Sequence, residues 1–134
     1  MSEHISLDIQ GAVATITFNR PEARNALSPE LRAGLVEFTT QVEMDASIRC
    51  LVLRGAGGHF MAGGDIKGFK ARQQLSPEQR KGEILKGLHG LHFAINRLRR
   101  MPKPVLACVE GAAAGAGLSI VAACDLAIAS ADSY

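Results

Sequence analysis

Two short glycine-rich segments are the parts of this 134-residue sequence whose residue types and spacing could serve chemistry. The first runs from Gly55 to Lys67, and the second from Glu110 to Gly117. Each follows a short apolar run and precedes a helix-like pattern. The free N–H groups at a helix start, with no Cβ in the way, suit an anion or a developing oxyanion. Two such loops that converge on one carbonyl oxygen would form an oxyanion hole.

Both loops also have a plainer interpretation. The glycines of the first can simply turn the chain while Asp65 caps a helix, and the second can let a small-residue helix pack closely on a sheet. Neither loop is a nucleotide motif, because Gly115-Ala-Gly117 is followed by Leu118-Ser119-Ile120 and no GK[ST] sequence is present. Glycine content alone leaves the two interpretations open.

The elements that must position these loops follow from the hydrophobic pattern. Strands are predicted where apolar residues alternate or run together between turn signals, over 5–9, 13–18, 50–53, 105–109 and 125–130. Helices are predicted where apolar residues recur at helical spacing or a cap precedes them, over 28–44, from Asp65 onward, over 76–101 and over 118–124. This order indicates one α/β domain over residues 1–134 in which strands lead through glycine-rich loops into helices.

Composition argues against a nucleic-acid partner. The formal net charge is only +2, from 15 lysines and arginines against 13 aspartates and glutamates. No basic run is longer than Arg99-Arg100, and aromatic residues are limited to five Phe and one Tyr. Nucleic-acid binding calls for a basic surface or stacking aromatic side chains, and the sequence supplies neither.

The cysteines and the chain's apolar stretches bear on location. Cys50, Cys108 and Cys124 form no C-x-x-C pair, and each lies in an apolar run, which predicts reduced thiols and a cytoplasmic protein. The N-terminus lacks the basic and apolar regions of a secretory signal. The longest apolar stretch, 112–123, is too short to span a bilayer, so no membrane partner is expected.

Histidines are the remaining side chains that could do chemistry. His89 and His92 are three residues apart on a predicted helix, but the sequence offers no third ligand beside them, so no metal site is predicted. His59 precedes the core of the first loop and is expected to be a surface residue.

Three motifs together carry a resemblance to a known family. They are the segments 19–27 (NRPEARNAL), 60–67 (FMAGGDIK) and 103–117 (KPVLACVEGAAAGAG), the last followed by Cys124-Asp125. Their order and spacing resemble the crotonase superfamily, the enoyl-CoA hydratase/isomerase family, over the N-terminal half of a typical member. The resemblance implies a ClpP/crotonase spiral of β-β-α units, incomplete within these residues. It also implies a homo-trimer or hexamer for the full-length protein.

The resemblance implies an enzyme that acts on acyl-CoA thioesters, with coenzyme A as part of the substrate and no separate cofactor. The backbone N–H groups of Gly64 and Ala116 would hold the thioester oxygen and stabilise an enolate; Ala116 stands where glycine is commoner. The residues expected along the coenzyme A path are Arg24, Ala26, Ala62, Asp65, Ile66 and Lys67. Among these, Arg24 and Lys67 are candidates for phosphate contacts.

Ser119 is the informative departure from the family pattern. Hydratases of this family carry a glutamate here, which works with a second glutamate further along to position water and transfer a proton. The serine therefore favours isomerase-type chemistry, which needs one base, and that base is expected beyond Tyr134. Two alternatives stay open: a hydratase with a relocated carboxylate, and a non-catalytic CoA-thioester-binding or structural fragment. A halved α/β domain is also expected to expose apolar surface and self-associate.

Overall fold

The computed structural model describes residues 3–134. Its strands and helices follow the predicted order, with one turn of 3-10 helix, η1, that the sequence pattern did not predict. The elements are β1 (Ile5–Gln10), β2 (Val13–Phe18), η1 (Pro21–Ala23), α1 (Pro29–Met44), β3 (Cys50–Gly55), α2 (Ile66–Arg72), α3 (Pro77–Arg100), β4 (Val105–Val109), α4 (Ala116–Ala123) and β5 (Leu126–Ala129).

Two element boundaries differ by more than one residue from the sequence-based prediction. Strand β3 continues to Gly55, because its last residue still pairs with Phe18 of β2. Helix α4 begins at Ala116 rather than Leu118. Its N-cap, Gly115, has a φ of 54°, a left-handed backbone that glycine adopts without strain and that lets the helix start two residues earlier.

The five strands form one sheet in the order β1-β2-β3-β4-β5. Strand β1 pairs antiparallel with β2, and every later pair is parallel. The carboxyl ends of β2, β3 and β4 therefore lie at the same edge of the sheet. The three sequence motifs leave the sheet there, side by side, although they are far apart in the sequence.

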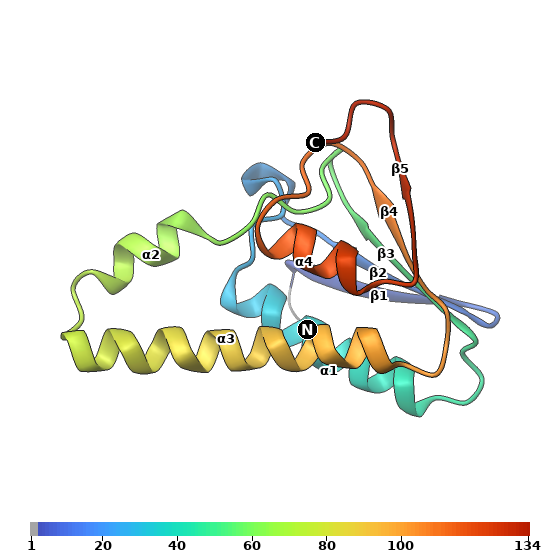
Figure 1. Ribbon diagram of the computed structural model, residues 1–134, viewed down its shortest axis with the longest axis horizontal. Coiled ribbons are helices and arrows are strands. Elements are labelled where there is room, and N and C mark those ends of the chain that lie inside the picture. The colour runs from blue at the N-terminus through green and yellow to red at the C-terminus, as the bar shows by residue number, and fades with distance from the viewer. Residues whose placement is uncertain (1–2) are drawn as a thin grey trace.

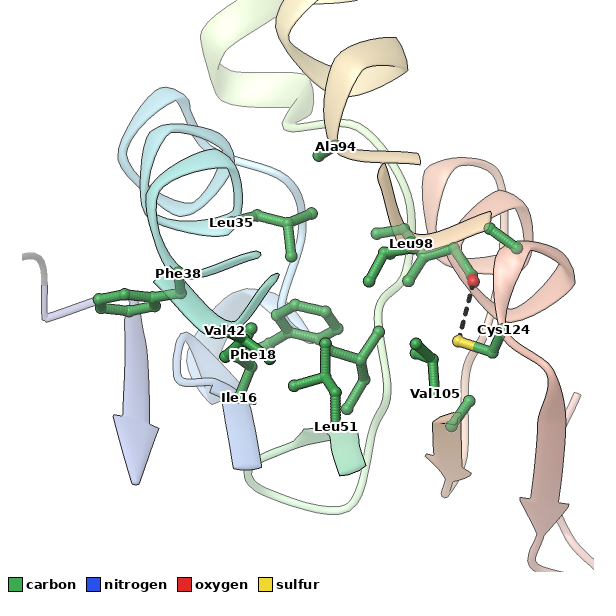
Figure 2. Packing of buried hydrophobic residues seen from close by; sticks show 14 of the residues in the cluster. Ile16, Phe18, Leu35, Phe38, Val42, Leu51, Ala94, Leu98, Val105 and Cys124 are labelled. Atoms are coloured by element: carbon green, nitrogen blue, oxygen red, sulfur yellow. Dashed lines mark hydrogen bonds between the residues drawn. The ribbon is translucent and has the colours of Figure 1, made fainter. Parts of the chain in front are cut away.

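Helices α1, α3 and α4 cover one face of the sheet (Figure 1). Strand side chains on that face meet apolar residues of the helices in a continuous core, part of which Figure 2 shows. One loop residue belongs to this core: the Phe60 ring is fully buried and packs edge-on against Phe18 of β2, with ring centroids 5.3 Å apart. The first glycine-rich loop is thus anchored in the core at the residue where its FMAGGDIK motif begins.

Helix α2 and the first half of α3 extend away from the sheet, on the left of Figure 1. Helix α2 has no buried residue, and the first buried residue of α3 is Gly87. A capping box holds the start of α3, because Ser76 and Gln79 exchange hydrogen bonds between side chain and backbone. This arm is therefore held by local helix geometry more than by tertiary packing.

The opposite face of the sheet carries exposed apolar side chains. Val13 is 42% exposed, and Leu126 and Ile128 of the edge strand β5 are 63% and 65% exposed. The register places Leu126 beside Leu106, and Ile128 beside Cys108, on this face. The expectation of exposed apolar surface is confirmed, and self-association stays a prediction.

Candidate active site

Backbone hydrogen bonds join the two glycine-rich loops to each other. The Met61 N–H donates to Ala112 O at 2.9 Å, and the Ala114 N–H donates to Met61 O at 3.0 Å. Just before them, the Phe60 N–H donates to Glu110 O at 2.8 Å. The first loop thus runs as a short parallel strand beside the second, which fixes their relative position independently of side-chain type.

The NRPEARNAL segment lies along the other side of the first loop. The Leu27 N–H donates to Gly63 O at 2.8 Å, and the Ala62 N–H donates to Arg24 O at 3.0 Å. Leu27 therefore forms its parallel bridge opposite Gly64. In such a bridge Leu27 bonds to the neighbours of Gly64, so the N–H of Gly64 itself points away from Leu27. The Gly64 N–H is left free of the NRPEARNAL segment.

Asn25 is a structural residue of this segment that the sequence analysis missed. It is fully buried, with a φ of 57°. Its side-chain Nδ2 donates to Ala56 O at 2.9 Å and to His59 O at 2.7 Å, and its Oδ1 accepts the Arg20 N–H at 2.8 Å. One buried amide thus ties the segment to the first glycine-rich loop. Its signal in the sequence is the asparagine itself, which tolerates the left-handed backbone.

His59 is not the surface residue that we predicted. It is half-buried, and its Nδ1 accepts the backbone N–H of Ala112 at 3.1 Å. His59 therefore joins the two glycine-rich loops through a side chain, alongside the backbone bonds.

The glycines permit an approach that larger residues would block. A Cβ at Gly117 would collide with the backbone oxygen of Met61. Gly63 has a φ of 110°, and a Cβ there would lie 3.3 Å from Ala114 O, while one at Gly115 would lie 3.4 Å from the Gly63 Cα. The two loops are in backbone contact, and close packing and positive φ both account for the glycines.

A pocket of about 340 Å³ opens where the loops meet α2 and α3. Gly64, Ala116 and Ser119 all line it. Ala116 is the first residue of α4, so its N–H has no partner within the helix. Across residues 3–134, neither the Gly64 nor the Ala116 N–H donates to a protein acceptor. Two unused backbone donors from different loops therefore border one pocket.

Asp65 lines the pocket but its carboxylate is already committed. One oxygen lies 3.0 Å from Arg20 Nη1, and the other accepts the Lys67 N–H at 3.1 Å as the N-cap of α2. Both side chains of the ion pair are largely buried, at 12% and 16% exposure. This carboxylate neutralises Arg20 and starts α2, so it is poorly suited to act as a base.

Two other groups near α4 bear on the chemistry. Ser119 is exposed, and its hydroxyl donates to Gly115 O at 3.3 Å. Cys124 is buried at the end of α4, and burial together with the neighbouring Asp125 raises the pKa of its thiol to about 12. Cys124 is therefore protonated at neutral pH and does not serve as a nucleophile.

The structure places the other predicted coenzyme A residues around the pocket rather than in it. Arg24, Ile66 and Lys67 are exposed, Ala62 is half-buried and Ala26 is buried. None of these five residues is in the pocket lining, although Ala26 and Ile66 adjoin the lining residues Leu27 and Asp65.

The long helix carries the two histidines that sequence analysis considered for metal binding. Both are exposed, and His92 lines the pocket whereas His89 does not. Residues 3–134 hold no group of three or more His, Cys, Asp or Glu arranged to bind a metal ion. Over the same residues, no helix is long and apolar enough to cross a membrane.

Residues of α1, α2 and α3 form a wall of the pocket that sequence reasoning missed. They are Pro29, Arg32, Gly68, Phe69, Arg72, Glu83, Ile84, Gly87, Leu88, Leu91 and Ile95. The available signal was the apolar stripe of the long helix, which the sequence analysis used only to predict the helix itself. Because α3 extends past the sheet, part of that stripe faces the pocket.

Comparison with known proteins shows which family this chain resembles. The family model for enoyl-CoA hydratase/isomerase matches residues 8–134. The 1,2-epoxyphenylacetyl-CoA isomerase of Escherichia coli is 38% identical over 129 residues, covering 96% of this chain and 48% of that protein. An enoyl-CoA hydratase of Mycobacterium tuberculosis is 40% identical over 123 residues, covering 90% of this chain and 44% of that protein.

The solved structures agree. An enoyl-CoA hydratase/isomerase from Marinobacter aquaeolei superposes with a TM-score of 0.89 at 39% identity, covering 98% of this chain and 50% of that chain. The mixed α/β sheet with its helices is therefore the crotonase fold, as the resemblance implied. The chain belongs to the enoyl-CoA hydratase/isomerase family, and it spans about half the length of the curated relatives it matches.

Proposed function

We propose that this chain binds an acyl-CoA thioester and stabilises its enolate, and that the reaction is an isomerase-type shift of a double bond. The observation that carries the proposal is the meeting of Gly64 and Ala116 at one pocket, each with an N–H that has no acceptor in the described residues. Two fixed donors are what a developing oxyanion requires. Since the donors belong to the backbone, alanine at position 116 can serve as well as glycine.

In the proposed reaction a base removes a proton from the carbon between the thioester carbonyl and a β,γ double bond. The electron pair moves onto the carbonyl oxygen, where the Gly64 and Ala116 N–H groups hold it. The proton returns at the γ carbon, the double bond becomes conjugated with the carbonyl, and no atom is gained or lost. We expect the base to follow Tyr134 in the whole protein, because the Asp65 carboxylate is held by Arg20.

Ser119 supports isomerisation over hydration. It lines the pocket on α4, and its hydroxyl donates to the Gly115 carbonyl. A hydroxyl cannot replace a carboxylate as a base at neutral pH, so water addition would lack one of the two groups that position and deprotonate water.

The coenzyme A part of the substrate is assigned to the flank of the pocket. Arg24 and Lys67 are exposed, and the Arg24 carbonyl accepts the Ala62 N–H at 3.0 Å, beside the first loop. Their exposed cations suit the phosphates of coenzyme A, whereas Ala26 and Ala62 leave room for the chain that joins the nucleotide to sulfur. Coenzyme A would enter only as part of the substrate, with no separate cofactor.

One assay separates the candidate reactions. A β,γ-enoyl-CoA thioester is incubated with the whole protein, which includes the expected base, and ultraviolet absorbance reports formation of the conjugated α,β-enoyl thioester. Isomerisation gives rising absorbance at constant mass. If the whole protein binds the thioester in calorimetry but changes neither absorbance nor mass, its function is non-catalytic binding of the thioester.

Hydration is the second candidate function, because the relatives include enoyl-CoA hydratases. In the reverse form of the assay, a hydratase consumes an α,β-enoyl thioester and adds the mass of one water. That result would require a carboxylate relocated from position 119. If no CoA thioester binds at all, the proposal as a whole is overturned.

Assembly into a homo-trimer or hexamer, in the cytoplasm, belongs to the same proposal for the whole protein. The exposed apolar face around Val13, Leu126 and Ile128 supports association rather than a monomer. Light scattering on the chain tests it, and a cleanly monomeric species at micromolar concentration would contradict it.

A further inference from the structure

Two arginines line the pocket with no carboxylate paired to them. Arg32 lies on α1 and Arg72 ends α2, and both are half-buried. The ion pairs among residues 3–134 involve His4, Arg20 and Arg97, and none of them includes either pocket arginine. A pocket with largely apolar walls thus holds two guanidinium groups whose charge is not neutralised by an ion pair.

Contacts connect these arginines to the proposed oxyanion site. The Phe69 ring lies against Gly64, so closely that a Cβ at Gly64 would be 2.9 Å from it. The Arg72 guanidinium stands 5.6 Å from the centre of the same ring. Arg32 borders the pocket from the other side, with its Nη1 2.9 Å from where a Cβ of Gly87 would lie. One aromatic ring therefore separates Gly64 from the guanidinium of Arg72.

The charge balance of the pocket is positive. Asp65 is neutralised by Arg20, which leaves Glu83 as the one further carboxylate in the lining, against Arg32 and Arg72. Burial, and then the nearby positive charge of Arg72, lower the pKa of Arg32, while Glu30 and Glu83 oppose this shift. An anion bound beside both guanidinium groups would relieve their repulsion and gain charge-assisted hydrogen bonds.

We propose that the acyl group of the substrate ends in a carboxylate, which Arg32 and Arg72 bind while the thioester carbonyl lies at Gly64 and Ala116. The inference rests on the proposed function and adds the substrate class: a thioester with a short apolar spacer between the carbonyl and a terminal anion. Leu88, Leu91 and Ile95 of the pocket wall would contact the spacer. The planar, two-pronged guanidinium group matches a carboxylate better than a lysine would.

The test compares two CoA thioesters that share the same glutaryl chain in calorimetry, glutaryl-CoA and its terminal methyl ester. The chain is expected to bind the carboxylate form about tenfold more tightly, as for a partly exposed charge-assisted contact. Arg32→Gln is expected to remove that preference while leaving the affinity for the ester within about twofold. Arg99→Gln is the matched control, because Arg99 is exposed on α3 outside the pocket lining, and it should leave both affinities unchanged.

The outcomes are distinguishable. Equal or tighter binding of the ester by the unmodified chain overturns the carboxylate proposal and leaves the proposed function standing. If Arg32→Gln weakens the binding of both thioesters equally, the arginine contacts the phosphates of coenzyme A, and the carboxylate proposal is overturned too. Repeating the comparison with phosphate-free pantetheine thioesters checks that assignment, because the carboxylate preference should persist there. Binding of neither CoA thioester would overturn the proposed function itself.

Discussion

The pocket has two sides that are built in opposite ways. On one side, the loops 60–64 and 111–117 are joined by backbone hydrogen bonds and glycine contacts, and Phe60 anchors them in the core. On the other side, α2 and the first half of α3 present partly exposed side chains, with Phe69 52% and Leu88 43% exposed. The backbone side is suited to a feature that all thioesters share, the carbonyl. The side-chain side is suited to the acyl group, which differs between substrates.

This difference predicts two kinds of mutational effect. Changes on the backbone side should be large and independent of the acyl group, because they displace the donors themselves. Changes on the α2–α3 side should be smaller and should depend on the acyl group, as proposed for Arg32. The following predictions run from the largest expected effect to the smallest.

Gly117→Ala should have the largest effect. The new Cβ would meet the Met61 backbone oxygen, which cannot move without breaking its bond from the Ala114 N–H. The start of α4 must shift, so the turnover number of the whole protein is expected to fall about a hundredfold or more for every acyl group tested. Overpacking should also lower the free energy of unfolding by about 1–3 kcal/mol.

Gly82→Ala is the matched control, because it is also a helical glycine but has open space where the Cβ would be. It should leave turnover unchanged and raise the free energy of unfolding by up to about 1 kcal/mol. Turnover and urea unfolding are measured for both variants. Equal turnover would contradict the proposal that the N-terminus of α4 holds the thioester oxygen.

Asn25→Ala removes a buried amide and leaves the groups that it satisfied without partners. Three hydrogen bonds are lost, to Ala56 O, His59 O and the Arg20 N–H. The free energy of unfolding is expected to fall by about 2–4 kcal/mol. Asn96→Ala, at an exposed position on α3, should cost less than about 0.5 kcal/mol. Similar losses of unfolding free energy in both variants would contradict the role of Asn25 in joining its segment to the first glycine-rich loop.

Ser76→Ala probes the α2–α3 side. It deletes the capping box at the start of α3, for an expected cost of about 1 kcal/mol in the free energy of unfolding. Hydrogen exchange should quicken in the first turns of α3 and not in the sheet. Acyl-CoA affinity should change by less than about threefold. A loss of affinity of about a hundredfold, the size expected for turnover in Gly117→Ala, would contradict the distinction between the two sides.

Cys124 gives a predicted effect that is absent at neutral pH and appears only in alkaline solution. The pKa of its thiol in the folded chain is raised from 9.0 to about 12, first by burial and then by Asp125. The folded state thus binds the proton more tightly, so this contribution is intact below pH 9 and is lost as the pH rises from about 9 towards 12. Urea unfolding between pH 8 and 11 should show a shallower decline in Cys124→Ala, and an unchanged slope would contradict the burial of this thiol.

The same division explains what could be predicted from the sequence. Strand alternation, the Ser-Pro-Glu helix starts and the glycine motifs are local signals, and they predicted the elements and the two loops. Their meeting at one edge followed only from the resemblance and the parallel order of the strands. That Gly64 and Ala116 line one pocket therefore needed the three-dimensional structure.

The α2–α3 side could not be predicted, for a physical reason. Arg32 and Arg72 belong to different helices, and no spacing rule links positions that meet only across a pocket. His59 was misjudged for the same cause: its partner, Ala112, is 53 residues away in the chain. Asn25 has a local signal in its left-handed turn, but its three partners are fixed by the packing of the loops.

The most direct test of the oxyanion site is the carbonyl stretch of a bound thioester. An acyl-CoA with a ¹³C-labelled thioester carbonyl is added to the chain, and isotope-edited infrared difference spectroscopy compares its bound and free forms. Hydrogen bonds from the Gly64 and Ala116 N–H groups are expected to shift the stretch to lower wavenumber, and Gly117→Ala should reduce that shift. A bound thioester whose carbonyl stretch matches that of the free compound in water would contradict the assignment of these two donors.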